Sequence, residues 1–142
     1  MADHHDLESL AAAVNRILGP RAAAIVVFGS AACGRLTPES DVDIAYLPRE
    51  IRGGAEATVE RLELAGELEA ALGRRVDLID LSRSGPILNW QIVKTGTVIW
   101  GAESRAWAEF RLRIPTQYED FKRERAAAEA RLSRGGVTGE GS

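Results

Sequence analysis

The chain has 142 residues, of which 45% are hydrophobic and 27% charged, and its formal net charge is -3. This length suits one compact domain with a continuous core, and the slightly acidic balance disfavours direct nucleic-acid binding through phosphate contacts. A single cysteine, Cys33, excludes an internal disulfide, and the chain has no apolar run long enough to cross a bilayer, so we expect a cytoplasmic protein without membrane partners.

The chain alternates two kinds of apolar pattern. Apolar residues three and four positions apart predict amphipathic helices, whereas short runs rich in branched residues predict buried strands. Glycines and prolines mark the ends of these segments. In chain order we predict a helix over 7–18, a strand over 24–28, a short helix over 30–35, a strand over 41–47, a helix over 55–72, a strand over 75–81, a helix over 84–95 and a strand over 97–100.

The C-terminal part has a helical pattern from about residue 103 onward. Pro115 is expected to interrupt or kink that helical segment, because proline lacks the N–H that continues a helix. We expect residues 135–142 to form a disordered tail. Residues 1–134 are accordingly predicted to be one domain, with no linker that divides it.

Two aspartates lie close together on the strand predicted over 41–47. Alternate strand positions place Asp41 and Asp43 on one face, about 7 Å apart along the strand. Two carboxylates about 6 Å apart repel by roughly 3 kcal/mol at an effective dielectric constant of about 20. The pair therefore indicates a site for a cation, and carboxylate oxygens are ligands that Mg²⁺ prefers.

Gly29-Ser30 follows the first predicted strand, and ten residues separate it from Asp41. A glycine at this position lets a ligand approach the backbone closely. The N–H groups that follow it and the Ser30 hydroxyl can hold phosphate oxygens, with Ser30 as the N-cap of the short helix predicted over 30–35. Gly29, Ser30, Asp41 and Asp43 are thus predicted to bind one nucleotide.

This stretch resembles the signature of the DNA polymerase beta-like nucleotidyltransferases, in particular their minimal (MNT) branch. The strand over 75–81 resembles the one that carries a third carboxylate in that family, and the resemblance assigns this role to Asp77. Strand alternation puts Asp80 on the opposite face from Asp77. Asp80 therefore remains the alternative third carboxylate, with a turn-capping role as its competing interpretation.

The resemblance and the element order together imply an α/β fold, in which helices flank a small mixed sheet. The resemblance also implies catalysis by Asp41, Asp43 and Asp77, which would hold two Mg²⁺ ions and use ATP to transfer AMP to a hydroxyl. Cys33 lies where relatives often have arginine, so the phosphate site lacks one charge unless Arg35 replaces it.

The acceptor is expected to come from outside this short chain. Stand-alone members of the MNT branch resemble antitoxins that add AMP to a tyrosine of a HEPN ribonuclease toxin, and we expect such a toxin as partner. An apolar face of the C-terminal helical segment would dock the partner. Two alternatives remain: a small-molecule nucleotidyltransferase of the aminoglycoside-modifying type, and a non-catalytic antitoxin that acts by contact alone.

Overall fold

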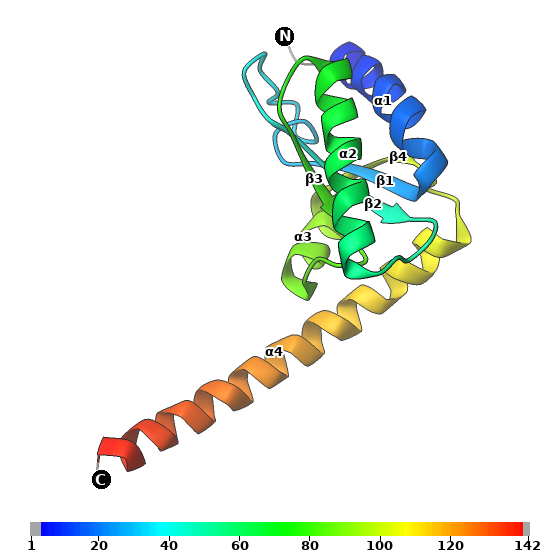
Figure 1. Cartoon of the computed structure of the whole chain (residues 1–142). Helices are drawn as coiled ribbons and strands as arrows, with labels where there is room; N and C mark the ends of the chain where they lie inside the picture. The colour runs from blue at the N-terminus through cyan, green and yellow to red at the C-terminus, as the bar shows by residue number, and fades with distance from the viewer. Residues whose placement is uncertain (1–3, 141–142) are drawn as a thin grey trace.

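The structure is a computed structural model that describes residues 4–140, with the side chains of residues 7–134. One body of helices and strands is followed by a long C-terminal helix (Figure 1). The elements are α1 (His4–Leu18), the 3-10 helix η1 (Gly19–Arg21), β1 (Ala22–Phe28), β2 (Val42–Pro48), α2 (Gly54–Leu72), β3 (Val76–Asp80), α3 (Pro86–Thr95), β4 (Thr97–Trp100) and α4 (Arg105–Glu140).

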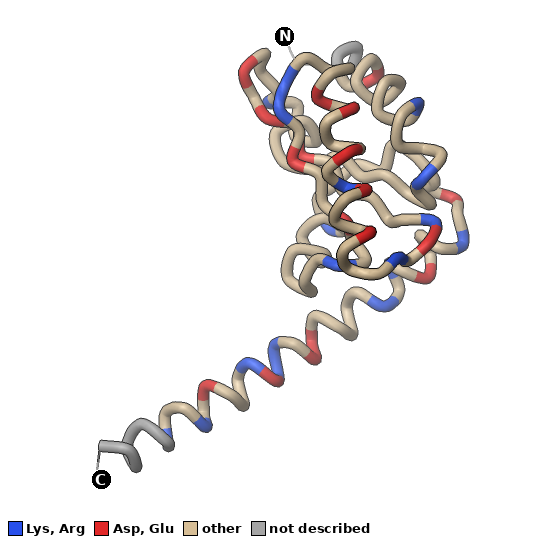
Figure 2. The backbone as a smooth tube through the Cα atoms, in the orientation of Figure 1, with Lys and Arg blue, Asp and Glu red and all other residues tan. Residues whose placement is uncertain are grey.

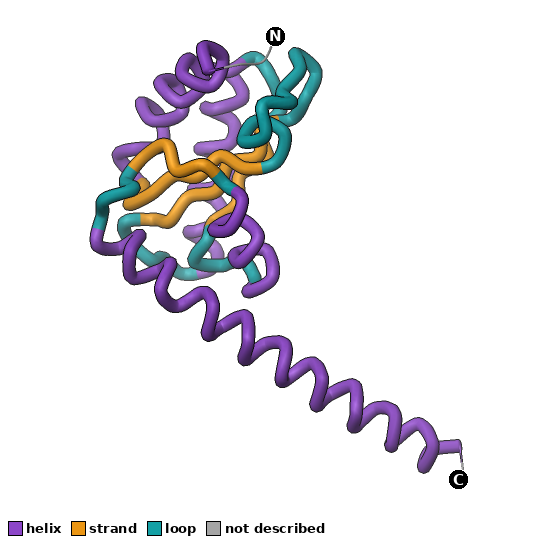
Figure 3. The backbone as a smooth tube through the Cα atoms, turned by 180° about the vertical axis from the view of Figure 1, so that it is seen from behind, coloured by secondary structure: helices purple, strands orange, loops and turns teal. Residues whose placement is uncertain are grey.

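The four strands form one mixed sheet in the order β3-β2-β1-β4 (Figure 3). Strand β1 is antiparallel to both β2 and β4, whereas β3 runs parallel to β2. The parallel pair is joined through α2, as a crossover connection requires. The two central strands are β1 and β2, and the start of β2 carries the predicted Asp-x-Asp motif.

Both faces of the sheet are buried. On one face Ile25 and Ile44 pack with α1 and α2, while on the other face Val26 and Ala45 pack with α3 and the start of α4. Neighbouring strand residues point to opposite faces, so each central strand needs apolar residues at nearly every position. This explains the uninterrupted apolar runs in the sequence and confirms the predicted α/β class.

Most predicted elements are present, with ends that coincide or are shifted by up to three residues. The exception is the short helix predicted over 30–35, which is wrong. That segment is a series of turns, in which the Cys33 N–H donates to the Gly29 carbonyl at 3.2 Å and the Arg35 N–H donates to the Ser30 carbonyl at 2.8 Å. The first bond has the four-residue spacing of an α-helix, but the second spans five residues, and the Gly34 N–H donates to the Ala31 carbonyl three residues back at 3.4 Å. The spacing therefore does not repeat as a regular helix requires.

Helix α4 continues through Pro115, so the predicted interruption is wrong. Its first part is held against the body by buried Trp107, Phe110 and Ile114, and Tyr118 stacks on Trp90 of α3 with ring centroids 5.0 Å apart. Tertiary packing on both sides of Pro115 offsets the cost of the missing backbone hydrogen bond.

The distal part of α4 extends away from the body and carries charges of both signs (Figure 2). Ion pairs three or four residues apart stabilise this exposed helix; they are Lys122–Glu119, Arg123–Asp120 and Arg125–Glu129.

The predicted tail over 135–142 stays a prediction, because the side chains of 135–140 and all of 141–142 lie outside the described residues. In the part of the chain that the structure describes, no helix is long and apolar enough to span a membrane.

Candidate active site

The turn after β1 brings the backbone close to a carboxylate of β2. Gly29 has a φ of 67°, a left-handed conformation that L side chains rarely adopt. A side chain at this position would also overlap the Asp43 carboxylate. The left-handed turn therefore favours glycine at position 29, and a Cβ there would displace the Asp43 carboxylate from its position in this structure.

Ser30 lies next to this contact and is partly exposed. Its hydroxyl has no hydrogen-bond partner among the described residues, whereas its carbonyl oxygen is held within the turn by the Arg35 N–H. A free hydroxyl on a fixed backbone can bind an oxygen of a ligand without first breaking an internal bond.

The sheet register brings three aspartates together. Asp43 is paired with Phe28 of β1 on one side and with Asp77 of β3 on the other. Asp41 immediately precedes β2 and is exposed, as Asp77 is. Because side chains alternate along a strand, Asp41, Asp43 and Asp77 project from the same face of the sheet.

The electrostatics of Asp43 reflect this gathering of charge. Burial raises the pKa of its carboxyl above the ordinary value of 3.8, and the nearby charges of Asp77 and Asp41 raise that pKa further. Each of these effects disfavours the charged form of Asp43. A cation bound among the three carboxylates would instead favour the charged form of Asp43, because it would stabilise all three negative charges.

The donor chemistry of this cluster fits magnesium. It offers carboxylate oxygens and contains no sulfur or imidazole ligand, and hard oxygen ligands are those that Mg²⁺ takes. Across the described side chains no three His, Cys, Asp or Glu residues already stand in coordinating geometry. An ion or a bound nucleotide would therefore have to draw the three carboxylates together.

Asp80 lies on the other face of the sheet and is buried. Its Oδ1 accepts hydrogen bonds from the Ser82 N–H at 2.9 Å and from the Ser82 hydroxyl at 2.6 Å. Asp80 also faces Tyr46 across the strand pair, where burial followed by the Asp80 charge raises the pKa of Tyr46 to about 12. Asp80 therefore caps the turn after β3 and lies apart from Asp43.

One residue of this region was missed in the sequence. The Arg74 guanidinium donates to the carbonyl oxygens of Thr37 and Ser40 at 2.9 and 3.4 Å, and so fixes the loop that leads into Asp41. Thr37 and Ser40 are also joined to each other through their hydroxyls at 2.8 Å. An arginine directly after the helix-ending Gly73 was the only available signal, and nothing in the sequence linked it to a loop more than thirty residues earlier.

Cys33 and Arg35 are both exposed in the turn after Ser30. Arg35 lies five residues after Ser30 along the chain, and its guanidinium has no bonding partner among the described residues. Its availability for a ligand is consistent with the expectation that Arg35 replaces the charge missing at Cys33.

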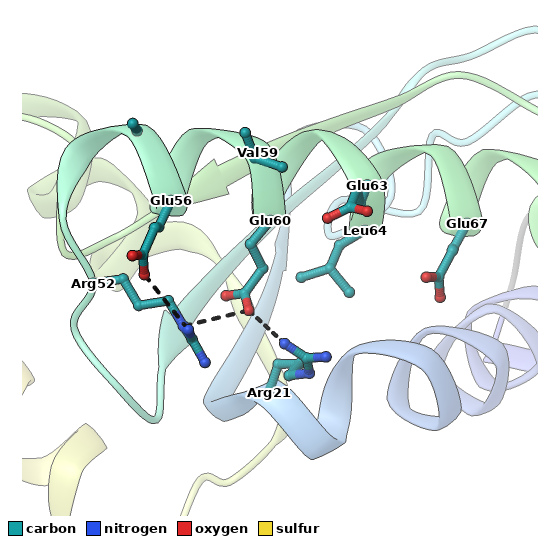
Figure 4. A pocket seen from close by; sticks show the side chains of 9 residues that line it. Arg21, Arg52, Glu56, Val59, Glu60, Glu63, Leu64 and Glu67 are labelled. Carbon is teal, nitrogen blue, oxygen red and sulfur yellow. Dashed lines mark hydrogen bonds and ion pairs between the residues drawn. The ribbon is translucent and has the colours of Figure 1, made fainter.

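A separate pocket lies between η1 and α2, away from the aspartates (Figure 4). Glu60 of α2 is mostly buried there and pairs with Arg21 at 2.5 Å and with Arg52 at 3.6 Å. These pairs tie the start of β1 and the loop before α2 to the helix. Glu60 is thus neutralised, whereas Glu63 and Glu67, which line the same pocket (Figure 4), have no ion pair among the described residues.

Comparison with known proteins agrees with this geometry. The family model described as "Polymerase beta, Nucleotidyltransferase" matches residues 16–105. The chain is 32% identical over 108 residues to the protein adenylyltransferase MntA of Shewanella oneidensis, a match that covers 76% of this chain and 74% of that protein.

Solved structures with the same architecture extend the similarity. A chain of a toxin-antitoxin complex with AMP-PNP has a TM-score of 0.72 and 28% identity, and the match covers 87% of this chain and 98% of that one. A chain from the complex of tri-AMPylated Shewanella oneidensis HEPN toxin with its MNT antitoxin has a TM-score of 0.70 and 26% identity, with coverage of 89% and 98%.

Proposed function

The chain belongs to the polymerase beta nucleotidyltransferase family, and we propose that it transfers AMP from ATP to a tyrosine hydroxyl of a HEPN-type toxin. The observation that carries this proposal is the position of Asp43, which lies under the Gly29 turn and between Asp41 and Asp77. The relatives' names, a protein adenylyltransferase and an MNT antitoxin bound to an AMPylated HEPN toxin, support the choice of acceptor.

Nucleotide binding is assigned to Gly29, Ser30, Asp41 and Asp43. The Gly29 turn lets the triphosphate approach the backbone, and the Ser30 hydroxyl donates to a phosphate oxygen. AMP-PNP, which a related complex contains, has the triphosphate-like group that such a turn would hold.

Asp41, Asp43 and Asp77 would hold Mg²⁺, for which their carboxylates are suitable ligands, and two ions are expected. When bound, the ions supply positive charge that neutralises the phosphates and polarises the reacting oxygens. The chain itself positions the reactants. It holds the nucleotide on the Gly29 side of Asp43, and Asp77 lies on the other side of Asp43.

The reaction is a displacement at the α phosphorus. The acceptor hydroxyl oxygen forms the new bond to phosphorus, the bond to the bridging oxygen breaks, and pyrophosphate leaves. The hydroxyl proton passes to a carboxylate oxygen of Asp77, which is exposed and therefore accessible to the acceptor. Positioning and charge stabilisation supply the rate enhancement, without a covalent enzyme intermediate.

A co-expression experiment tests this function against neutralisation by contact alone. Cells would produce the product of the neighbouring gene, as the candidate HEPN-type toxin, together with either the wild-type chain or Asp43→Asn. The proposal predicts that the wild-type chain restores growth and that Asp43→Asn does not, although Asp43→Asn still accumulates as a folded protein. Equal protection by both chains would contradict catalysis and support a contact-only antitoxin.

A further inference from the structure

A shallow pocket runs along the outer edge of β3, beginning at Asp77. Its volume is about 270 Å³, and residues of α2, β3 and the loop after β3 line it. In the sheet order β3-β2-β1-β4, this edge of β3 has no neighbouring strand (Figure 1). The pocket therefore connects a candidate catalytic carboxylate to an unpaired strand edge.

The backbone of β3 identifies which groups face this edge. The Val42 N–H donates to the Arg75 carbonyl and the Leu81 N–H donates to the Tyr46 carbonyl, both at 2.9 Å. In a parallel ladder only every second residue bonds to a given neighbour. The odd-numbered residues of β3 thus bond to β2, and the N–H and carbonyl of Leu78 point outward into the pocket.

Backbone groups at both ends of this edge have hydrogen-bond partners, whereas those in its middle do not. The Val76 N–H donates to Glu69 Oε2 at 3.0 Å, and the Asp80 carbonyl accepts from the N–H groups of Arg83 and Ser84 at 3.1 and 3.0 Å. Among the described residues the backbone groups of Leu78 have no such partner. The open segment is therefore short and lies directly beside Asp77.

Two arginine side chains flank this segment. Arg61 of α2 and Arg83 of the loop after β3 both line the pocket. In residues 7–134 neither guanidinium has a hydrogen bond or an ion pair, although Asp77 and Asp80 line the same pocket. Two uncommitted guanidinium groups beside a free strand edge favour a segment that carries carboxylates.

The sheet order also fixes the direction from which an acceptor must come. The Gly29 turn follows β1, Asp43 is on β2 and Asp77 is on β3. A nucleotide bound at the Gly29 turn leaves its pyrophosphate on the β1 side, and in-line displacement brings the acceptor oxygen from the opposite side. That opposite side is the edge of β3.

We propose that an extended acidic segment of the protein acceptor adds to the free edge of β3, bonding to the Leu78 backbone with its carboxylates on Arg61 and Arg83. This arrangement delivers the acceptor hydroxyl beside Asp77, and it rests on the proposed function because the segment belongs to the acceptor. Main-chain pairing supplies affinity, whereas the two arginines select acidic over basic segments.

Amide exchange measured by NMR tests the strand pairing. The probe is the product of the neighbouring gene, as the candidate HEPN-type acceptor, added to the full chain with a non-hydrolysable ATP analogue. Exchange of the Leu78 amide is expected to slow at least about tenfold on complex formation, because it gains an acceptor. The Asp77 and Ile79 amides, which face β2, serve as internal controls that are protected in both states.

Steady-state kinetics test the role of the arginines. The double variant Arg61→Gln/Arg83→Gln is expected to raise the KM for the protein acceptor about tenfold, with kcat and the affinity for ATP unchanged. The matched control is Arg16→Gln, an exposed arginine of α1 without a bonding partner among the described residues. Its KM should equal that of the wild-type chain.

The outcomes separate this proposal from the proposed function. Normal AMP transfer with an unchanged Leu78 amide and an unchanged KM in the double variant would overturn the edge proposal and leave the enzyme assignment intact. Slowed Leu78 exchange in the chain alone at high concentration would assign the edge to a second copy instead. If the wild-type chain transfers no AMP to the acceptor, the proposed function itself fails.

Discussion

The α carbon of Gly29 lies so close to the Asp43 carboxylate that no side chain fits between them. The left-handed φ of 67° at Gly29 creates this contact by turning the chain immediately after β1. A phosphate bound by the turn and a cation bound by Asp43 would thus be neighbours. The contact brings the two parts of the sequence motif together in space.

Gly29→Ala is expected to abolish AMP transfer and to lower the free energy of unfolding by about 2 kcal/mol, because it adds backbone strain and a clash. Urea denaturation and a transfer assay measure the two effects. Gly66→Ala is the matched control: it lies in α2 with open space around it, and should stabilise the chain by about 0.5–1 kcal/mol. A Gly29→Ala chain with normal activity would refute the required close approach.

Asp43→Asn is expected to abolish transfer while raising the thermal unfolding temperature in metal-free buffer at neutral pH. The raised pKa of Asp43 means that the folded chain binds its proton more tightly than the unfolded chain does. Wild-type stability therefore falls as pH rises from below 3.8 through the raised pKa of folded Asp43.

Asp43→Asn does not lose stability in this way as the pH rises. Its higher stability relative to the wild-type chain should therefore be present at pH 7 and disappear below about pH 4. Thermal melts across this pH range, in the presence of a chelator, measure the difference. Destabilisation by Asp43→Asn at neutral pH would show that repulsion among the aspartates is not the dominant effect. Added Mg²⁺ should raise the melting temperature of the wild-type chain more than that of Asp43→Asn.

Asp77→Ala and Asp80→Ala should have opposite effects. Asp77 is exposed on the face of Asp43, so its removal should lower kcat at least about a hundredfold with little change in stability. Asp80 is buried and accepts two hydrogen bonds from Ser82, so its removal should destabilise the chain by about 2 kcal/mol and leave kcat nearly unchanged. Paired kinetic and denaturation measurements decide between them, and a larger kcat loss in Asp80→Ala would transfer the third-carboxylate role to Asp80.

Arg74→Ala is expected to lower kcat about tenfold and to raise the Mg²⁺ concentration needed for half-maximal activity. Its guanidinium holds the Thr37 and Ser40 carbonyls, and without it the loop before Asp41 is less fixed. Arg74→Lys should restore part of the activity, whereas Arg75→Ala is the neighbouring control on an exposed arginine. An unchanged metal dependence in Arg74→Ala would show that the loop does not position Asp41.

The strands and the pair Asp41 and Asp43 could be predicted because their signals are local, whereas the role of Asp77 came from the family resemblance. Alternation along two strands determines which carboxylates share a face, and branched apolar runs mark the strands themselves. Asp43 and Asp77 are neighbours because β2 and β3 pair in a parallel register. The sequence pattern does not reveal this register, and only the family resemblance indicated that the two residues lie together.

Features that depend on tertiary contacts could not be predicted in this way. The hydrogen bonds of Arg74 join residues that are more than thirty positions apart, and no periodicity reveals such a pair. Within the turns over 30–35, Gly34 has a left-handed φ of 71°, which a regular right-handed helix does not allow and which the local helix signal did not reveal. Likewise, Pro115 remains inside α4 because Trp107, Phe110 and Ile114 hold the helix against the body.

Intact-mass spectrometry tests the central claim most directly. The product of the neighbouring gene, as the candidate HEPN-type acceptor, would be incubated with the chain, ATP and Mg²⁺, and with Asp43→Asn in a parallel reaction. We predict that the partner gains the mass of one or more AMP units only with the wild-type chain, and that peptide mapping places them on tyrosine. A partner that binds the wild-type chain stably but gains no mass would contradict the assignment of this chain as its adenylyltransferase.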